Sequence, residues 1–517
     1  MNEPRPNAFD EVLYPSAALV QTHPDRLATI ATLMGIQPTP VARCRVLELG
    51  CGDGANLLPM AFGLPRSEFV GIDLAAKPIA EGQVAAQALG LHNLRLEQAD
   101  LLDFTPAWGQ FDYIIAHGLY AWVPRVVQDK LLAVCCDNLA PHGVAYVSYN
   151  TYPGSHLRDM LREMMLFHLR ELTSPTGRIQ EAKALARFLA IPRAKPDPYQ
   201  NFMIAEAEQI IEHAGGHLYH DELAETFCPA YFHQFIAHAT EHRLQYLAEA
   251  DYYEMQDHIY PPEIIEELDR VAPTRLLREQ YLDFLKCRRF RQTLLCHANL
   301  SVKTNPSPEI VRQFWISSQA RPASAQPELT SRKMERFTGK KGAGMETDHP
   351  LTKAAMFTLG QSWPHRLVID ELLNQARSVL GCASEAARGP GADDAGTLCE
   401  TLLQAHGAGL VEFHLHAPAS ATQPGGHPTA SALARYQIQH GDVVTNLYHQ
   451  PVQVEGAMAK ALLLLLDGTR DRAALNAAMA AELQGSAASS RPPDLQLVAG
   501  QLDKQLAKLA RLGLLVA

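Results

Sequence analysis

The sequence predicts an α/β fold: a doubly wound, mainly parallel sheet of seven strands with a helical insertion, followed by a C-terminal α+β region. Between residues 43 and 150, short apolar segments alternate with amphipathic ones, which is typical of a parallel sheet covered by helices on both faces. A glycine-rich segment, Glu48–Gly54, follows the first apolar segment directly, where such sheets place a ligand-binding loop. The 517 residues are enough for several domains, and 47% of them are hydrophobic.

Five strands are predicted in this part of the chain, at 45–49, 68–73, 94–98, 111–116 and 144–149. Each is apolar along most of its length, as strands buried on both faces should be. We take residues 36–154 as the core of the sheet. Ahead of it, residues 1–35 should form an N-terminal lid helix, capped by Thr22 and with Pro24 in its first turn.

After residue 154 the alternation stops. Residues 155–300 should hold a helical insertion over the sheet and then its last two strands, at 244–247 and 290–296. Residues 301–345 look like a linker, because 317–327 is rich in Ser, Pro and Ala and 332–341 is basic.

The C-terminal region, residues 346–517, repeats one pattern. Segments 403–411 and 509–516 both show the end of a helix, then a glycine, then a strand. This repeat suggests two tandem winged-helix-like units. The region holds 16 acidic and 12 basic residues, and its net charge of −4 (12 minus 16) favours docking or a homodimer over DNA binding.

Composition narrows the partners. A formal charge of −11 makes nucleic acid an unfavourable substrate and suits a basic protein or peptide. The longest apolar run, 461–466, is too short for a membrane span, and the N-terminus lacks a signal segment. Nine cysteines without a C-x-x-C pair are expected to be reduced, so we expect a cytoplasmic protein.

The loop after the first strand fits two kinds of cofactor. Gly50, Gly52 and Ala55 also satisfy the dinucleotide pattern G-x-G-x-x-A, and Asp73 could accept the ribose hydroxyls of either cofactor. The third strand leads into Asp100 and Leu101, where an acid can accept from an adenine amino group and an apolar side chain can pack on the ring.

Taken together, these motifs resemble class I methyltransferases, which have a Rossmann-like sheet and a loop of the form E-x-G-x-G-x-G. The resemblance implies S-adenosylmethionine as cofactor. The residues implied to bind it are Glu48, Gly50, Cys51, Gly52 and Gly54 around the methionyl part, Asp73 at the ribose, Asp100 and Leu101 at the adenine, and His117 beside the methyl group, with Leu74, next to Asp73, also in the set.

The chain also resembles a narrower group of bacterial proteins, which join this core to a methyltransferase regulatory domain. The group includes protein lysine methyltransferases that act on outer-membrane proteins. Segments 116–124, 148–154 and 289–297 are among those that carry the resemblance, which covers about the first 300 residues. It implies methylation of lysine side chains in a protein.

Polar and aromatic residues past the fourth and fifth strands should form the acceptor side. Methyl transfer from a sulfonium is an in-line displacement, so the enzyme mainly aligns the reactants and excludes water. The expected catalytic residues are Tyr149, Asn150 and Tyr152 together with His117, and the expected substrate-binding residues are Tyr120 and Trp122 in the opposite wall and Tyr14 and His23 in a lid.

Other interpretations stay open. A small metabolite could be the acceptor, or the chain could be a non-catalytic regulator that binds S-adenosylmethionine. The segment His238–His242 fits the zinc-protease pattern H-x-x-E-H. We expect no metal there, because this helix should pack on the sheet and 22 histidines make a chance match easy.

Overall fold

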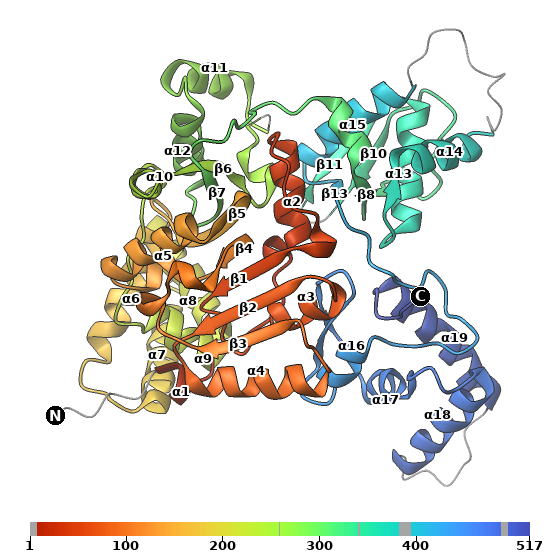
Figure 1. Ribbon diagram of the computed structural model, residues 1–517, viewed down its shortest axis with the longest axis horizontal. Helices are drawn as coiled ribbons and strands as arrows, with labels where there is room; N and C mark the ends of the chain where they lie inside the picture. Colours follow the sequence, from red (N-terminus) through yellow and green to blue (C-terminus); the bar gives the residue numbers. More distant parts are fainter. Residues whose placement is uncertain (1–7, 258, 340–341, 382–393, 487–494) are drawn as a thin grey trace.

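A seven-stranded sheet forms the centre of the molecule (Figure 1). The computed structural model describes residues 8–257, 259–339, 342–381, 394–486 and 495–517. The strands follow the order β3-β2-β1-β4-β5-β7-β6, and β7 runs antiparallel to both of its neighbours. They are β1 (Arg45–Leu49), β2 (Glu68–Asp73), β3 (Leu94–Gln98), β4 (Phe111–Ala116), β5 (Leu139–Asn150), β6 (Leu244–Glu249) and β7 (Phe290–His297).

Helices cover both faces of the sheet, which confirms the doubly wound fold. Helices α2 (Pro24–Leu33), α3 (Leu57–Gly63) and α4 (Ala76–Ala88) pack on one face, and α5 (Arg125–Asp137) and α10 (Phe232–Glu241) on the other. Side chains of β5 alternate between the two buried clusters, as the two-residue period of a strand requires. The carboxyl ends of β1 to β5 therefore meet at one edge, framed by helices.

Helix α2 begins differently from the prediction. Its N-cap is His23, whose Nδ1 accepts the backbone N–H of Asp25 at 3.1 Å. The predicted cap, Thr22, is wrong, because its hydroxyl is buried and donates to the carbonyl of Leu19 at 2.8 Å. The side chains of His23 and Thr22 therefore both form hydrogen bonds with the backbone around the start of α2.

The helical insertion has a hydrophobic cluster of its own. It consists of α6 (Ser155–His168), α7 (Pro175–Leu189), α8 (Pro198–Glu212), α9 (Gly215–His217) and a π-helical turn at Leu218–Glu222. A short helix, α1 (Ala8–Glu11), lies next to α4, while α11 (Pro262–Val271) and α12 (Arg275–Lys286) connect β6 to β7.

Much of the segment expected to be a linker is folded. Strands β8 (Trp315–Ser317), β9 (Arg321–Pro322), β10 (Glu335–Thr338) and β11 (Gly344–Thr347) lie between residues 315 and 347. Phe314, Ile316 and Phe337 are fully buried. The linker interpretation of 301–345 fails here because a few apolar residues at core positions outweigh the Ser- and Pro-rich composition around them.

Two winged-helix-like units follow and confirm the α+β interpretation of this region. The first contains α13 (Pro350–Ser362), β12 (Leu367–Val368), α14 (Ile369–Val379), α15 (Asp394–Gly407) and β13 (Glu412–His414), with β8 between β12 and β13. The second contains α16 (Ala432–Gln437), β14 (Val443–Thr445), β15 (Pro451–Gln453), α17 (Ala457–Leu465), α18 (Arg472–Ser486) and α19 (Leu495–Arg511). In it, Thr429 pairs with Asp467 and Ala430 with Leu515, which repeats the three-stranded arrangement of the first unit.

The two units join the sheet domain in different ways. Buried residues of the first unit belong to the same hydrophobic cluster as α2, whereas the second unit has a separate cluster. The first unit is therefore an extension of the sheet domain's own core. Within the described part of the chain, no helix combines the length and apolar character needed to cross a bilayer.

Candidate active site

The loop between β1 and α3 forms the floor of the candidate site. Its backbone takes the left-handed conformation at Gly50, Gly52 and Gly54, with φ of +74°, +56° and +73°. Side chains rarely adopt that conformation, so glycine is required. A Cβ added at Gly52 would lie 3.5 Å from the hydroxyl oxygen of Ser16, its nearest neighbour, so the loop backbone stays open to a ligand.

Asp73 at the end of β2 fixes this loop. One carboxylate oxygen accepts the Gly52 N–H at 2.8 Å, and the other accepts the Ala75 N–H at 2.9 Å. Burial raises the pKa of Asp73 above its ordinary value. A carboxylate offers about four lone-pair sites, so the group can still accept hydroxyl donors from a ribose.

The expected adenine side is only partly exposed. Leu74 is 58% exposed and offers an apolar surface, whereas Leu101 is buried in the core beneath. Asp100 is exposed and accepts the backbone N–H of Leu102 at 2.9 Å, which caps a short 3₁₀ turn. The structure thus brings Asp100 and Leu74 to the surface of the site and leaves Leu101 as support.

Glu48 lies beneath the glycine loop and is almost fully buried. One carboxyl oxygen accepts the Asn56 side-chain amide at 2.8 Å, and the other has no hydrogen-bond partner among the described residues. Burial raises the pKa of Glu48 to about 8. A cationic ligand at the loop would relieve this cost, because an opposite charge favours the ionised carboxylate. Cys51, also expected at this site, is buried beside the loop.

His117 at the end of β4 is held by β5. Its Nδ1 lies 2.9 Å from the hydroxyl of Tyr146 and 3.2 Å from that of Ser148. Burial lowers the pKa of His117 to about 4, so the imidazole is neutral at physiological pH. A neutral ring suits a position beside a cationic sulfonium.

Tyr149 and Tyr120 lie inside the core. Tyr149 is 1% exposed and stacks on Phe235 of α10 with ring centroids 4.1 Å apart. Tyr120 is 2% exposed, and its hydroxyl lies 2.8 Å from Nδ1 of His238. This burial argues against the direct contacts with an acceptor that the sequence suggested for both residues, and it gives them a supporting position below the site.

Asn150 and Tyr152 lie closer to the edge of the sheet. Asn150 is buried, and its side-chain Oδ1 has no hydrogen-bond partner among the described residues. Tyr152 is half-buried, stacks on His156 with centroids 4.0 Å apart, and donates to Asp159 at 3.2 Å. Burial raises the pKa of Tyr152 to about 12.

The N-terminal segment lies across the glycine loop. Asp10 accepts the backbone N–H of Lys77 at 2.9 Å, at the start of α4. Tyr14 donates to Asp221 of the insertion at 3.4 Å, and its ring meets the edge of His217.

Trp122, expected in the wall of the acceptor side, packs on Phe227 and lies under the guanidinium of Arg158.

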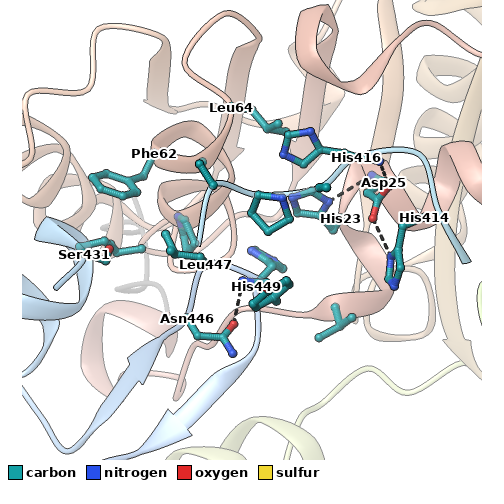
Figure 2. A pocket seen from close by; sticks show the side chains of 18 of the residues that line it. His23, Asp25, Phe62, Leu64, His414, His416, Ser431, Asn446, Leu447 and His449 are labelled. Carbon is teal, nitrogen blue, oxygen red and sulfur yellow. Dashed lines mark hydrogen bonds and ion pairs between the residues drawn. The ribbon is translucent and has the colours of Figure 1, made fainter. Parts of the chain in front are cut away.

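His23 faces the winged-helix units instead. It lines a cavity of about 380 Å³ between α2, α3, the tail of β13 and the second unit (Figure 2). Its ring centroid lies 5.0 Å from that of His449, and burial lowers its pKa to about 3. The structure therefore separates His23 from the other expected lid residue, Tyr14.

Asp25 anchors α2 to the first winged-helix-like unit. Its carboxylate accepts from Arg366 and His414, each at 2.9 Å, and from the backbone N–H groups of Leu415 and His416 (Figure 2). The hydrogen bonds and the Arg366 charge hold the pKa of Asp25 well below its usual range despite the cost of its burial. Ionised and fully paired, this carboxylate fixes the unit against the sheet domain.

A second link, which no sequence motif indicates, reaches the cofactor loop. Oδ1 of Asn56 accepts from the Leu19 N–H at 2.9 Å, and Nε2 of His449 lies 3.0 Å away. The Asn56 amide also donates to Thr22 and to Glu48. His449 is buried and has a φ of +60°, unusual for a residue other than glycine. A chain of buried hydrogen bonds thus runs from the second winged-helix-like unit to Glu48.

Comparisons with known proteins match this arrangement. A family model described as a methyltransferase domain matches residues 46–143, a predicted methyltransferase regulatory domain matches 216–297, and the model described as the PKMT C-terminal winged helix domain matches 426–514. The chain is 33% identical over 479 residues to the uncharacterized protein RP789 of Rickettsia prowazekii, covering 91% of this chain and 85% of RP789.

The structure of PKMT2 from Rickettsia typhi has a TM-score of 0.86 to this one at 27% identity, covering 98% of this chain and 100% of that one. A second structure of PKMT2, in complex with AdoHcy, has a TM-score of 0.84. The chain belongs to this family of S-adenosylmethionine-dependent methyltransferases. RP028 of Rickettsia prowazekii is 38% identical over 233 residues, covering 45% of the methyltransferase and 93% of RP028.

The methyltransferase presents groups that fit its cofactor. S-adenosylmethionine carries a positive sulfonium and an ammonium group, and the unpartnered buried oxygen of Glu48 offers a negative charge beneath the loop. The open backbone at Gly52 and the lone pairs of Asp73 suit the methionyl part and the ribose. These residues could therefore hold the cofactor as the sequence analysis expects.

Proposed function

We propose that this methyltransferase transfers methyl groups to the Nε atoms of lysine side chains in a protein substrate. The observation that carries the proposal is the likeness to PKMT2 over 98% of the chain, winged-helix region included. A small metabolite needs no second docking surface, whereas a protein gains affinity from one. The bonds between His449, Asn56 and Glu48 support a winged-helix unit that works together with the cofactor loop.

In this proposal the glycine loop binds the methionyl part of the cofactor, and Asp73 binds the ribose. Gly50, Gly52 and Gly54 let the backbone approach the ligand. Bound S-adenosylmethionine supplies an activated methyl group on a sulfonium. Glu48 compensates the positive charge of the ligand, and its carboxyl group loses its proton as the complex forms, since its pKa without ligand is about 8.

The acceptor side then holds a neutral amine. A bond forms from the lysine nitrogen to the methyl carbon while the sulfur–carbon bond breaks, and the proton of the amine goes to solvent. The unpartnered Oδ1 of Asn150 accepts an N–H of the amine, and the ring of Tyr152 forms a wall beside it. His117 stays neutral beside the methyl group, while Tyr149 and Tyr120 position the end of β5 from the core.

The proposal extends to the setting of the enzyme. A net charge of −11 favours a basic protein or peptide over nucleic acid. We place the reaction in the cytoplasm of a bacterium, because the cysteines of the described residues form no disulfide and the relatives named above are bacterial. A homodimer through the winged-helix surface is the alternative to substrate docking there, and sedimentation with and without substrate separates the two.

Incubation with methyl-labelled cofactor and fractionated bacterial extract tests the proposal. Label in the protein fraction is the expected result, and label confined to small molecules would make the enzyme a metabolite methyltransferase. Cofactor binding without label in any fraction would support the third interpretation, a non-catalytic regulator. Activity on protein should also rise toward alkaline pH, because free lysine has a pKa of about 10.4 and only its neutral form attacks.

A further inference from the structure

Three metal-binding side chains meet outside the methyl-transfer site. Asp129 of α5, His238 of α10 and His242, the C-cap residue of α10, each offer one ligand atom, and these atoms all lie within 4.8 Å of one another. Both helices pack on the same face of the sheet (Figure 1). The cluster therefore bridges two helices that are more than a hundred residues apart in the sequence.

Local geometry explains why the three side chains converge. His238 and the C-cap residue His242 are four residues apart, about one helical turn, and their ring centroids lie 5.3 Å apart at the end of α10. Nε2 of His238 already lies 2.6 Å from Oδ1 of Asp129. Ligand atoms about 2.0–2.2 Å from a tetrahedral zinc are about 3.3–3.6 Å apart, so side-chain rotations must separate these two atoms by a further roughly 0.7–1.0 Å.

The surroundings of His238 resemble a prepared outer shell. Its other ring nitrogen, Nδ1, lies 2.8 Å from the Tyr120 hydroxyl. Without a metal, the Asp129 carboxylate accepts the Nε2–H, so Nδ1 of a neutral ring accepts from the Tyr120 hydroxyl. A metal on Nε2 displaces that proton, and Nδ1–H can then donate to the Tyr120 oxygen, as metal-bound histidines usually donate to an oxygen acceptor. His238 itself is 2% exposed, whereas Asp129 and His242 are partly open to solvent.

One charge competes for this position. Nε of Arg125 lies 3.3 Å from Oδ1 of Asp129, and the same guanidinium lies 3.8 Å from Glu241. The side chains of Arg125 and Glu241 are 58% and 69% exposed, so the guanidinium can move to Glu241 at little cost. An ion bound between Asp129 and His238 would then balance the negative charge of Asp129 in place of Arg125.

The sequence pattern alone led us to expect no metal here, but Asp129 of α5 supplies a third ligand, and we propose that Asp129, His238 and His242 form a binding site for a divalent transition metal of the zinc class. Two imidazoles and one carboxylate are a donor set that suits Zn²⁺, and three protein ligands leave a position for water. The ion joins α5 to α10 and fixes Tyr120 through His238. It serves structure in this position, and the site does not depend on the methyl-transfer proposal.

Direct metal binding by the full-length protein tests the site. After chelator treatment and dialysis, Zn²⁺ is titrated against a chromophoric competitor, and Co²⁺ is used as a spectroscopic probe. We expect one tight ion per chain and a visible Co²⁺ spectrum. His242→Ala and Asp129→Asn, both at partly exposed positions, should weaken binding at least about tenfold, and Tyr120→Phe should weaken it about 10–100-fold through the lost outer contact.

Matched controls separate this site from the other histidines and carboxylates. Asp137→Asn makes the same change on the same helix, and His142→Ala removes an exposed imidazole; both should bind like the wild type. Equal binding by the wild type, His242→Ala and Asp129→Asn would overturn the proposal. So would the absence of a stoichiometric Zn²⁺ or Co²⁺ complex in the wild type.

Discussion

Asn56→Ala tests the link between the winged-helix units and the cofactor loop. The amide is 5% exposed and accepts from the Leu19 N–H and from His449, while it donates to Glu48. Its removal leaves the donors of Leu19 and His449 without an acceptor, and each unsatisfied buried group costs about 1–3 kcal/mol. We therefore expect the free energy of unfolding to fall by roughly 2–5 kcal/mol.

Cofactor affinity should fall as well, because Glu48 loses the Asn56 amide, the one side-chain donor that the described residues give it beneath the loop. We expect the dissociation constant to rise about tenfold, which corresponds to a loss of about 1.4 kcal/mol of binding free energy. Denaturant unfolding measures the first effect and titration calorimetry with S-adenosylmethionine the second. His449→Ala should weaken cofactor binding in the same direction, from a position 393 residues away in the chain.

Asn138→Ala is the matched control. That amide is also buried, and it donates to the carbonyls of Thr105 and Gly109 at the opposite end of β4. Asn138→Ala should lower the free energy of unfolding and leave cofactor affinity unchanged. If Asn56→Ala destabilises the fold and binds the cofactor as tightly as Asn138→Ala does, the link does not reach the loop, and the reasoning is refuted.

Three further predictions concern the site itself. Asp73→Ala should weaken cofactor binding by about 1.5–3 kcal/mol, the range for hydrogen bonds to a charged group, and calorimetry that shows unchanged affinity would remove it from the site. Asn150→Ala should lower kcat more than it changes cofactor affinity, and Tyr152→Phe, which keeps the ring, should be the milder of the two; wild-type rates in both would exclude an acceptor-side role. Glu48, with its folded pKa raised to about 8, favours the folded state fully below the unfolded pKa of about 4.5, and this contribution is lost as pH rises through about 8. The unfolding free energy without cofactor should thus fall by roughly 2–3 kcal/mol between pH 6 and 9, and Glu48→Gln should abolish that part of the slope.

Most of the sheet was predictable because β1, β2 and β4 are largely buried, whereas the edge strand β3 buries one residue, Leu96. Strands β1 to β4 begin and end at the predicted residues, since a run of apolar residues bounded by turn residues is a local signal. Strand β5 starts earlier than predicted, at Leu139, which pairs with Phe111. Pro141 and Gly143 suggested a turn there, and only the pairing with β4 shows that the chain is already extended.

The candidate site was predictable in its loop and less so in its walls. Spacing alone placed the glycine loop and Asp73 side by side, as the 2.8 Å bond from Gly52 to Asp73 shows. Tyr149 and Asn150 are neighbours at the end of β5, and adjacent strand residues point to opposite faces. Which face α10 covers at that level depends on tertiary packing, so the burial of Tyr149 against Phe235 had no signal in the sequence.

Contacts between distant segments were beyond the sequence pattern. Asp25, in the first turn of α2, joins Arg366 and His414. Asn56 belongs to no motif, and His449 lies in a turn without a characteristic spacing. Such pairs are set by how the winged-helix units dock, and the composition of 301–345 concealed that the first unit begins there.

The acceptor atom is the most direct test of the proposed function. Protein labelled by the enzyme with methyl-labelled S-adenosylmethionine is hydrolysed, and its amino acids are separated. The account predicts that the label co-migrates with Nε-methylated lysine and that Gly52→Arg, which blocks the cofactor loop, removes it. Label on another amino acid, or equal labelling by Gly52→Arg, would contradict it.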